Sequence, residues 1–448
     1  MLASVVVHVA LGEVILTWLL IVFMTVAFTC WKGPQQINGS NAEDLEVELM
    51  TANPLHDAPE GTPGSELRHS AQVEAAPVAA ARLPFVDNVR VFLIALVVLS
   101  HCACAFGAGP GCNLVVGHDG PHWFKFGMFL VLMLNQAYVM SLFFFISAYF
   151  VPLSYAKGWE KFQAAKRRRL LVPALAVFFI VSPLTNVVAG HPGYSPSPGF
   201  TGVGWYLWWL LLFNVVYASF QSEYPPVDQS LVEAPTPGAD AGGPRLLLST
   251  CFRIGAGIGI CGLALLPFLW LIGFGSFFAS MPVLFVGSVT CDFLMFYLGL
   301  QAKAGGWLER PLTEQLDVHP LVLLGCVVAE GAGIVLTLRN FEKEPVNALI
   351  CVMLGGMYCL DMSLLVLLTF QRWANVETRA TRFLARGAFG VYLLHPLVVT
   401  AATRVYLVFA GKDVNYPVGF GFVAVVSLVV VWPLAYSLAQ LPGLRAVL

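Results

Sequence analysis

The chain has 448 residues, of which 58% are hydrophobic and 11% are charged, and its formal net charge is −2. Soluble domains carry roughly a quarter charged residues, so this composition excludes an ordinary soluble protein and requires an apolar solvent around the chain. The apolar runs are long enough to cross a bilayer as helices and too continuous for a membrane β-barrel, so the sequence predicts an all-α, polytopic integral membrane protein.

The first predicted element is an N-terminal anchor, residues 1–32. Its apolar run is too long for a secretory signal and has no basic segment before it, so we interpret it as a retained transmembrane helix. Residues 33–82 follow as a linker with few aromatic residues, a composition typical of disorder. A ten-helix membrane domain is predicted over residues 83–440, with a disordered insert at about 222–245. Its spans are expected at about 86–107, 124–153, 170–189, 203–221, 246–273, 281–300, 319–338, 346–370, 388–410 and 415–438.

Basic residues are distributed unevenly between the two sides of the membrane that these spans define. Nineteen of the 24 Lys and Arg residues fall on the side that holds both linkers and the C-terminus, and five fall on the other side. Because cytosolic loops carry the excess of Lys and Arg, the first side is predicted to be cytosolic. A wrong number of spans would disturb this alternation, so the charge bias also supports the span assignment.

Three ionisable residues lie in the first core helix, within the segment PFVDNVRVFLIALVVLSHCACAF. Arg90 and His101 are eleven residues apart, about 20° past three full turns, so they share one helix face and are separated by about 16 Å along the axis. Asp87 lies one turn before Arg90 and can pair with it. The pattern is compatible with an interfacial anchor at Arg90 and a packing hydrogen bond at His101. It is equally compatible with catalysis or transport, because a neutral imidazole is a common general base near neutral pH.

The next helix ends in the aromatic segment SLFFFISAYF, which contains Ser147, and leads into a predicted loop with six basic residues. Four of these are consecutive, Lys166 to Arg169, and Pro173 follows just inside the next helix. Such a loop would orient the chain and attract anionic lipid headgroups. Arg167, Arg168 and Arg169 would also suit a phosphate-bearing cytosolic anion, and the two roles do not exclude one another.

Weaker candidates occur in an extracytosolic loop and in the middle spans. His118, Asp119 and His122 form a short cluster of a kind that seldom binds a metal, and the ten cysteines show no paired spacing, so no metal site is predicted. The segment GWYLWW at the start of the fourth core helix is typical of an interfacial aromatic belt, with stacking on a sugar as the alternative. Asp292 and Asp361 are single carboxylates inside predicted spans, where ionisable groups are costly and often functional.

The ninth core span contains the segment RGAFGVYLLHPLVV, in which His395 follows Arg386 by nine residues. Pro396 has no N–H, so a carbonyl one turn earlier lacks its helical partner, which is tolerated where a neighbour or a cavity satisfies it. His395, together with Tyr392 and Ser147, is therefore a candidate second wall of one polar cavity. A packing role for these residues is the alternative.

Taken in order, these segments resemble the acyltransferase-3 family of membrane-embedded acyltransferases over about residues 83–440. That family shows an arginine, ten residues and then a histidine in its first core helix. An aromatic-Ile-Ser-Gly segment, a basic loop with a proline and a late Tyr-x-x-His-Pro-like segment follow. The similar segments here are Asp87–Arg90 through Ser100–His101, Phe143–Tyr149, Arg167–Leu170 with Pro173, and Gly390–Pro396. Val91 and Ala148 stand where the family usually has glycine.

The resemblance implies transfer of an acyl group, often acetyl, from cytosolic acyl-CoA to a hydroxyl of a carbohydrate, a lipid or a small metabolite. It implies that His101 is the general base, that Arg90 holds a phosphate or polarises the acyl carbonyl, and that Asp87 orients Arg90. The run Arg167 to Arg169 would draw the anionic donor to the mouth of the site. Acyl-CoA is then a co-substrate, with no bound cofactor. The other expected partners are a hydroxyl-bearing acceptor and the lipid bilayer, with no nucleic acid.

Other classes of function remain compatible with the sequence. A multi-pass transporter could use Arg90 and His101 as an ion or proton path, although transporters often contain inverted repeats and none is convincing here. The membrane-bound O-acyltransferase class also relies on a buried histidine, but the arginine-to-histidine spacing favours the acyltransferase-3 family. A purely structural role fits least well with this many buried ionisable groups.

Overall fold

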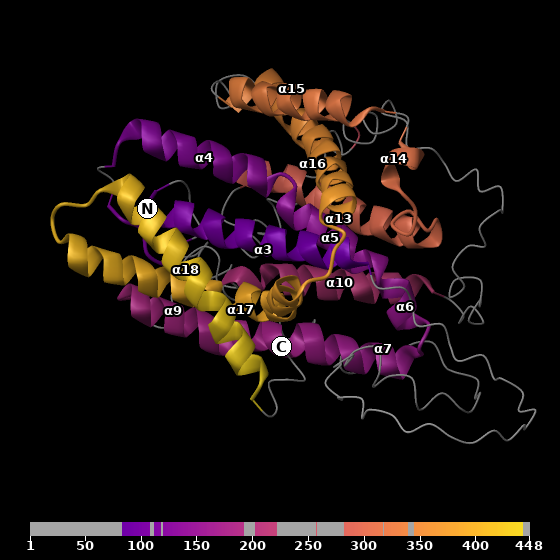
Figure 1. Cartoon of the computed structure of the whole chain (residues 1–448), viewed down its shortest axis with the longest axis horizontal. Coiled ribbons are helices and arrows are strands. Elements are labelled where there is room, and N and C mark those ends of the chain that lie inside the picture. The colour runs from indigo at the N-terminus through magenta and orange to yellow at the C-terminus, as the bar shows by residue number, and fades with distance from the viewer. Residues whose placement is uncertain are drawn as a thin grey trace, which may run out of the picture.

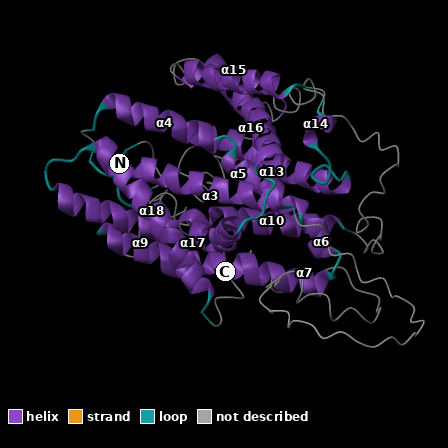
Figure 2. Ribbon diagram, viewed as in Figure 1, coloured by secondary structure: helices purple, strands orange, loops and turns teal. Residues whose placement is uncertain are grey.

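The computed structural model describes residues 83–107, 112–117, 120–191, 202–221, 257, 282–316, 318–338 and 345–441. These residues form helices and short connections without a β-strand, which confirms the predicted all-α class (Figure 2). In chain order the helices are α3 (Pro84–Ala105), α4 (His122–Gln136), α5 (Val139–Tyr149), α6 (Val151–Tyr155), α7 (Trp159–Lys166), η1 (Arg167–Leu171), α8 (Val172–Ala176), η2 (Val177–Val181), α9 (Ser182–Ala189), η3 (Gly202–Gly204), α10 (Trp205–Phe220), α13 (Pro282–Ala304), α14 (Leu312–Gln315), α15 (Pro320–Leu338), α16 (Pro345–Trp373), α17 (Arg379–Ala410) and α18 (Tyr416–Ala439).

Eight helical stretches among the described residues are long and apolar enough to cross a membrane, which confirms a multi-pass membrane protein. They are Pro84–Ala105, His122–Tyr155, Trp159–Ala189, Gly202–Phe220, Pro320–Leu338, Ile350–Trp373, Arg379–Ala410 and Tyr416–Ala439. Helix α13 coincides with a further predicted span, 281–300. The anchor, the 33–82 linker, the 222–245 insert and, apart from residue 257, the predicted span 246–273 lie outside the described residues. The count of ten core helices therefore stays a prediction.

Most helices lie side by side, roughly along the long axis of the view in Figure 1. Helix α17 packs against α3, α9 and α18, while α13 packs against α5. Helix α15 packs against α16 and lies at the upper edge of the bundle in Figure 1. The buried apolar cluster extends through α3, α5, α10, α17 and α18, so the helices that carry the candidate residues also form the core.

The third span is longer than predicted and includes the basic residues that were expected in a loop before it. The helical stretch begins at Trp159, eleven residues before the expected start, so Arg167, Arg168 and Arg169 lie in the π-helical turn η1 and the prediction of a loop was wrong. Lys and Arg are good helix formers, and their long side chains can reach water from a helix. The π turns η1 and η2 lie just before Pro173 and Pro183, where the missing proline N–H disturbs the regular hydrogen-bond ladder.

Helix α17 also begins earlier than predicted, at Arg379 rather than near residue 388. Its start is fixed by a capping box in which Thr381 N donates to Thr378 Oγ1 at 3.1 Å and Thr378 N donates to Thr381 Oγ1 at 2.9 Å. The first turns are basic and extend beyond the apolar part of the helix, which is why hydropathy alone placed the start too late.

Side-chain amides tie the start of α3 to the connection between α16 and α17. Asn88 Nδ2 donates to the carbonyl oxygens of Ala374 at 2.7 Å and Val376 at 3.0 Å. Asn375 Oδ1 accepts from Phe85 N at 3.3 Å, which satisfies one of the N–H groups that a helix start leaves without a helical partner. These bonds place the starts of α3 and α17 at the same end of the bundle. We call it the basic end, because it carries Arg310, Arg372, Arg379 and Arg382.

Candidate functional site

The Asp87–Arg90 pair forms as predicted from their spacing on α3. Arg90 Nη1 lies 3.3 Å from Asp87 Oδ1, and the side chains are 36% and 24% exposed, respectively. The Arg90 guanidinium also lies 5.0 Å from the centre of the Phe150 ring, just past the end of α5. A carboxylate on one side and an aromatic face on another hold this cation in place while leaving part of it accessible.

His101 and His395 meet in the interior, although they are 294 positions apart in the sequence. Their ring centres are 4.7 Å apart and their planes are inclined by 60°. His101 lies about 25 Å along α3 from Pro84, and His395 lies about 24 Å along α17 from Arg379, at 1.5 Å per residue. Because both helices start at the basic end, the two imidazoles reach the same depth.

The Tyr392 carbonyl that Pro396 leaves without a helical partner is used by His395. Its Nδ1 lies 2.7 Å from that oxygen. A carbonyl oxygen can only accept, so Nδ1 carries the proton in this contact and Nε2 of the neutral ring keeps its lone pair. The His395 side chain is fully buried, and Nε2 has no hydrogen-bond partner among the described residues. A proline that breaks the backbone ladder thus fixes the tautomer of the adjacent histidine.

Ser147 and Tyr392 are linked through Tyr206, a residue of α10. The hydroxyl groups of Ser147 and Tyr206 are 2.8 Å apart, and the ring centres of Tyr206 and Tyr392 are 5.7 Å apart. Tyr392 donates its own hydroxyl to the carbonyl of Val203. Three helices, α5, α10 and α17, therefore contribute hydroxyl groups to one polar cluster next to His395, whose ring centre is 6.1 Å from that of Tyr392.

Tyr206 was not among the site residues that the sequence predicted. It lies in the aromatic segment that suggested an interfacial belt, but this interpretation was wrong for Tyr206, Trp208 and Trp209, which are 8%, 2% and 6% exposed. Helix α10 packs against α8 and η1, and Tyr206 rests on the Phe144 ring of α5. An aromatic run at a span boundary looks the same in sequence whether it faces lipid or protein.

The predicted basic triplet does not line this cluster. Arg167, Arg168 and Arg169 are exposed side chains on η1, which packs against α10. They present charge at the surface of the protein.

The carboxylates predicted inside spans are buried, each in a different place. Asp292 is 2% exposed and accepts a hydrogen bond from Ser141 of α5 at 2.6 Å, which ties α13 to α5. Asp361 of α16 is 1% exposed, and Glu330 of α15, a residue that sequence reasoning passed over, is 4% exposed. These groups belong to helix contacts outside the His101–His395 pair. His118 and Asp119 lie outside the described residues.

Comparison with known proteins gives one result for the whole core. A family model, the acyltransferase domain of the acyltransferase-3 family, matches residues 83–436, and these contain all four of the motif segments. Neither a curated protein nor a solved structure matches the chain significantly. With most of its length covered by the family model and a multi-pass helical fold, the chain belongs to the acyltransferase-3 family of membrane acyltransferases.

Proposed function

We propose that this acyltransferase transfers an acyl group, with acetyl as the expected group, from cytosolic acyl-CoA to a hydroxyl of a carbohydrate, a lipid or a small metabolite. The observation that carries the proposal is the contact between His101 and His395, at a depth of about 25 Å from the basic end. Arg90 shares the His101 face of α3 and lies nearer that end. Arg90 near the basic end and the two histidines deeper in the bundle suit a donor whose phosphates stay at the membrane surface while its thioester extends into the interior.

The basic end is the cytosolic end in this proposal. Lys and Arg are in excess on the cytosolic side of multi-pass proteins, and α16 and α17 meet there in a connection flanked by Arg372, Arg379, Arg382 and Arg386. Acyl-CoA would then enter from the cytosol and the acceptor could approach from the opposite face. The exposed arginines of η1, Arg167 to Arg169, would raise the local concentration of the anionic donor without binding it in a defined pose.

His101 is the general base in the reaction. It takes the proton of the acceptor hydroxyl as that oxygen attacks the thioester carbonyl, and an oxyanion forms on the carbonyl oxygen. When the carbon–sulfur bond breaks, His101 returns the proton to the departing sulfur, so the acylated acceptor and free CoA leave with no net change in the enzyme. General-base catalysis of this kind contributes about 10²–10⁴-fold. A neutral His395 beside it accommodates the transient imidazolium better than a second cation would.

Arg90 and the hydroxyl cluster act on the substrates. Arg90, oriented by Asp87, would hold a donor phosphate or polarise the acyl carbonyl. On the side of the site formed by α5, α10 and α17, hydroxyl groups would offer hydrogen bonds to the acceptor, since a hydroxyl both donates and accepts. These groups belong to Ser147, Tyr206 and Tyr392.

The decisive test is acyl transfer in membranes that contain the protein. His101→Ala should abolish the incorporation of label from labelled acetyl-CoA into extractable acceptors, at unchanged expression and thermal stability. His122→Ala provides a matched control, because this histidine is exposed at the start of α4. Full activity of His101→Ala contradicts the proposal. Uptake of a solute without consumption of acyl-CoA would favour a transporter.

A further inference from the structure

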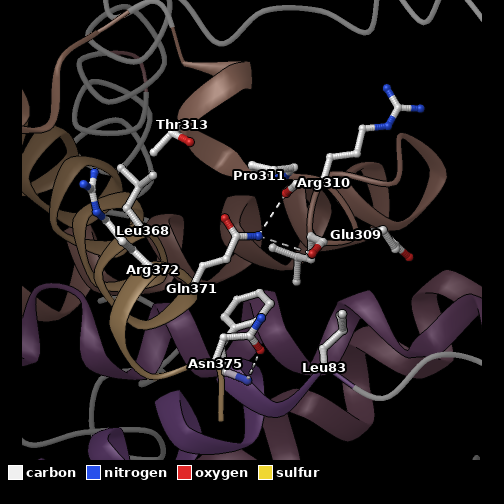
Figure 3. A pocket seen from close by; sticks show the side chains of 11 residues that line it. Leu83, Glu309, Arg310, Pro311, Thr313, Leu368, Gln371, Arg372 and Asn375 are labelled. Atoms are coloured by element: carbon white, nitrogen blue, oxygen red, sulfur yellow. Dashed lines mark hydrogen bonds between the residues drawn. The ribbon is translucent and has the colours of Figure 1, made fainter. Parts of the chain in front are cut away.

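The two ends of the bundle bring different side chains into contact. At the basic end, the Gln371 amide ties the α13–α14 turn to α16. Its Oε1 accepts from Leu312 N at 2.7 Å, and its Nε2 donates to the carbonyl of Arg310 at 2.9 Å (Figure 3). The Arg310 and Arg372 guanidinium groups point away from the adjacent pocket of about 390 Å³. At the opposite end, where α3 finishes, two cysteines are in contact.

Cys104 and Cys112 lie against each other where the chain turns back after α3. Cys104 belongs to the last turn of α3 and is 5% exposed, whereas Cys112 is half-buried and lies outside any helix. The two thiols are within hydrogen-bonding reach of each other. Cys112 also packs on a small buried cluster that consists of Ala103, Cys104, Leu132 and Met133.

Neighbouring contacts fix the position of Cys112. Its thiol donates to the carbonyl oxygen of His101, with Sγ 3.0 Å from that oxygen. Four residues further along, Val116 N donates to the Ala105 carbonyl at 2.7 Å, and the Tyr416 hydroxyl donates to the Val116 carbonyl at 3.3 Å. The chain after α3 is therefore held back against the end of that helix, and the Cys112 thiol stays beside its last turn.

Cys102, the other cysteine at this end of α3, faces another way. It is two positions from Cys104, which corresponds to a rotation of about 200° around the helix. Cys102 is fully buried, and its thiol lies near Ser427 of α18. Side chains on opposite faces of one helix cannot both form a bond with the same neighbour, so Cys104 is the cysteine that suits Cys112.

The pair lies at the end of the bundle that the proposed orientation places outside the cytosol. Cys104 follows Pro84 by 20 residues on a helix that starts at the basic end, which is about 30 Å along the axis. This length equals the thickness of a typical hydrocarbon core. Disulfides form and persist in extracellular, periplasmic and lumenal compartments, whereas cytosolic thiols are kept reduced.

The folded pair is a slow target for a weak oxidant. The hydrogen bond to Cys104, together with burial, raises the pKa of the Cys112 thiol well above its ordinary value. Because the thiolate is the reactive form, oxidation is fastest while this segment is still accessible, before the chain has packed around it.

We propose that Cys104 and Cys112 form a disulfide that fastens the chain after α3 to the last turn of that helix, one turn from His101. The Cys112 thiolate attacks a disulfide of a protein or small-molecule oxidant and expels one thiol. The Cys104 thiolate then attacks the Cys112 sulfur and expels the second thiol. The two cysteines lose two protons and two electrons, and the oxidant disulfide becomes two thiols. The inference uses the orientation in the proposed function but not the acyl-transfer reaction.

The experiment compares two labels on the full-length protein in membranes. Free thiols are first blocked with N-ethylmaleimide under denaturing conditions without a reductant. The protein is then reduced, and the thiols released are blocked with a heavier maleimide and located by mass spectrometry. Cys104 and Cys112 should carry the heavy label, whereas Cys102 and the half-buried Cys326 of α15 should carry the light one. Light label on Cys104 and Cys112 overturns the inference.

Substitutions identify the partner of Cys112. In Cys104→Ser, Cys112 should change from the heavy to the light label, because it has lost its partner. In the control Cys102→Ala, Cys104 and Cys112 should both keep the heavy label. If Cys112 keeps the heavy label in Cys104→Ser, it is bonded to another cysteine and the proposed pairing is wrong.

Thermal unfolding measures the effect of the bond on the protein. Dithiothreitol should lower the midpoint of the wild type by about 2 °C or more, because a disulfide restricts the unfolded chain. Cys112→Ser should unfold like the reduced wild type and should not respond to dithiothreitol, whereas Cys102→Ala should respond. A wild type that does not respond to dithiothreitol contradicts the proposal, and this comparison needs no variant that folds poorly.

The outcomes also separate this inference from the proposed function. If the disulfide is present but the protein transfers no acyl group from any acyl-CoA, the disulfide stands and the proposed function fails. If both cysteines carry the light label in protein that transfers acetyl from acetyl-CoA, the proposed function stands and the disulfide is refuted.

Discussion

At the residue scale, the most informative group is His395, because a neighbouring proline determines what it can do. The Tyr392 carbonyl left free by Pro396 takes the Nδ1 proton, so the fully buried ring presents an unprotonated Nε2 beside His101. An imidazole with the opposite tautomer would present a donor there instead. The backbone defect therefore has a chemical consequence for the polar cluster.

This tautomer can be tested with two substitutions of His395. Gln can donate its amide N–H to the Tyr392 carbonyl and keep an acceptor oxygen towards His101, whereas Leu keeps only the volume. We expect His395→Gln to retain markedly more acyl transfer than His395→Leu. If the hydrogen-bond acceptor at position 395 assists His101, the leucine variant should lose about 10²-fold or more of the activity. Steady-state kcat in purified protein measures this. Equal activities would mean that His395 only fills space.

Tyr206 permits a second residue-scale prediction. Tyr206→Phe removes the 2.8 Å contact with Ser147 but keeps the ring on Phe144, so the stability should fall by only about 1 kcal/mol. Acyl transfer should nevertheless fall several-fold, because the polar cluster of Ser147, Tyr206 and Tyr392 loses one of its hydroxyl groups. Tyr217→Phe, on the same helix, serves as the control in the same membrane assay. A loss that is equal in both variants would argue for a general effect on α10.

At the element scale, close helix approaches depend on single small residues. Helices α5 and α13 meet at Gly299, where an added Cβ would collide with the carbonyl oxygen of Phe145 and lie 2.7 Å from the Cβ of Ala148. Ala148 stands where the resemblance led us to expect glycine, so the small residue at this crossing is supplied by the opposite helix. The same contact positions Asp292 against Ser141.

Gly299→Ala should therefore destabilise the protein by about 1–3 kcal/mol, the usual cost of overpacking. Gly421→Ala on α18 is the matched control, because an added Cβ there meets no atom within 4 Å. At that position the higher helix propensity of alanine should leave the protein as stable or raise its stability by up to about 1 kcal/mol. Thermal unfolding in detergent measures both, and a stable Gly299→Ala would show that α5 and α13 can separate without cost.

At the scale of the whole molecule, we propose that the basic end lies on the cytosolic side of the membrane. At the basic end, the connection between α16 and α17 leads into the first turns of α17, which are rich in arginine. At the opposite end lies the tight turn Gly411–Asn415 before α18. The excess of positive charge at one end favours a single orientation.

Cysteine labelling tests this orientation in sealed membranes with a membrane-impermeant maleimide. Asp413→Cys should react from the non-cytosolic face, and Thr313→Cys should react only after the membrane is opened. The unmodified protein provides the background from its native cysteines. The reverse pattern would place the basic end outside the cytosol and leave acyl-CoA without access to Arg90.

The sequence by itself determined the fold class, the position of most spans, the shared face of Arg90 and His101, and the free carbonyl before Pro396. These features depend on hydropathy and on the geometry of one helix, which are local properties. Sequence periodicity also placed Asp87 beside Arg90, at 3.3 Å in the structure. Span ends were less accurate where basic residues continue a helix, as at Arg167 and Arg379.

Only the tertiary structure decided which distant residues meet. The contact of His101 with His395 depends on α3 and α17 starting at one end, a register held by Asn88 and Asn375. Tyr206 became part of the cluster only because α10 is buried on the side that contacts α5. The α13–α14 turn is likewise held in place by Gln371, a residue of α16. Such contacts depend on the packing of whole helices, which a single sequence does not encode in any local pattern.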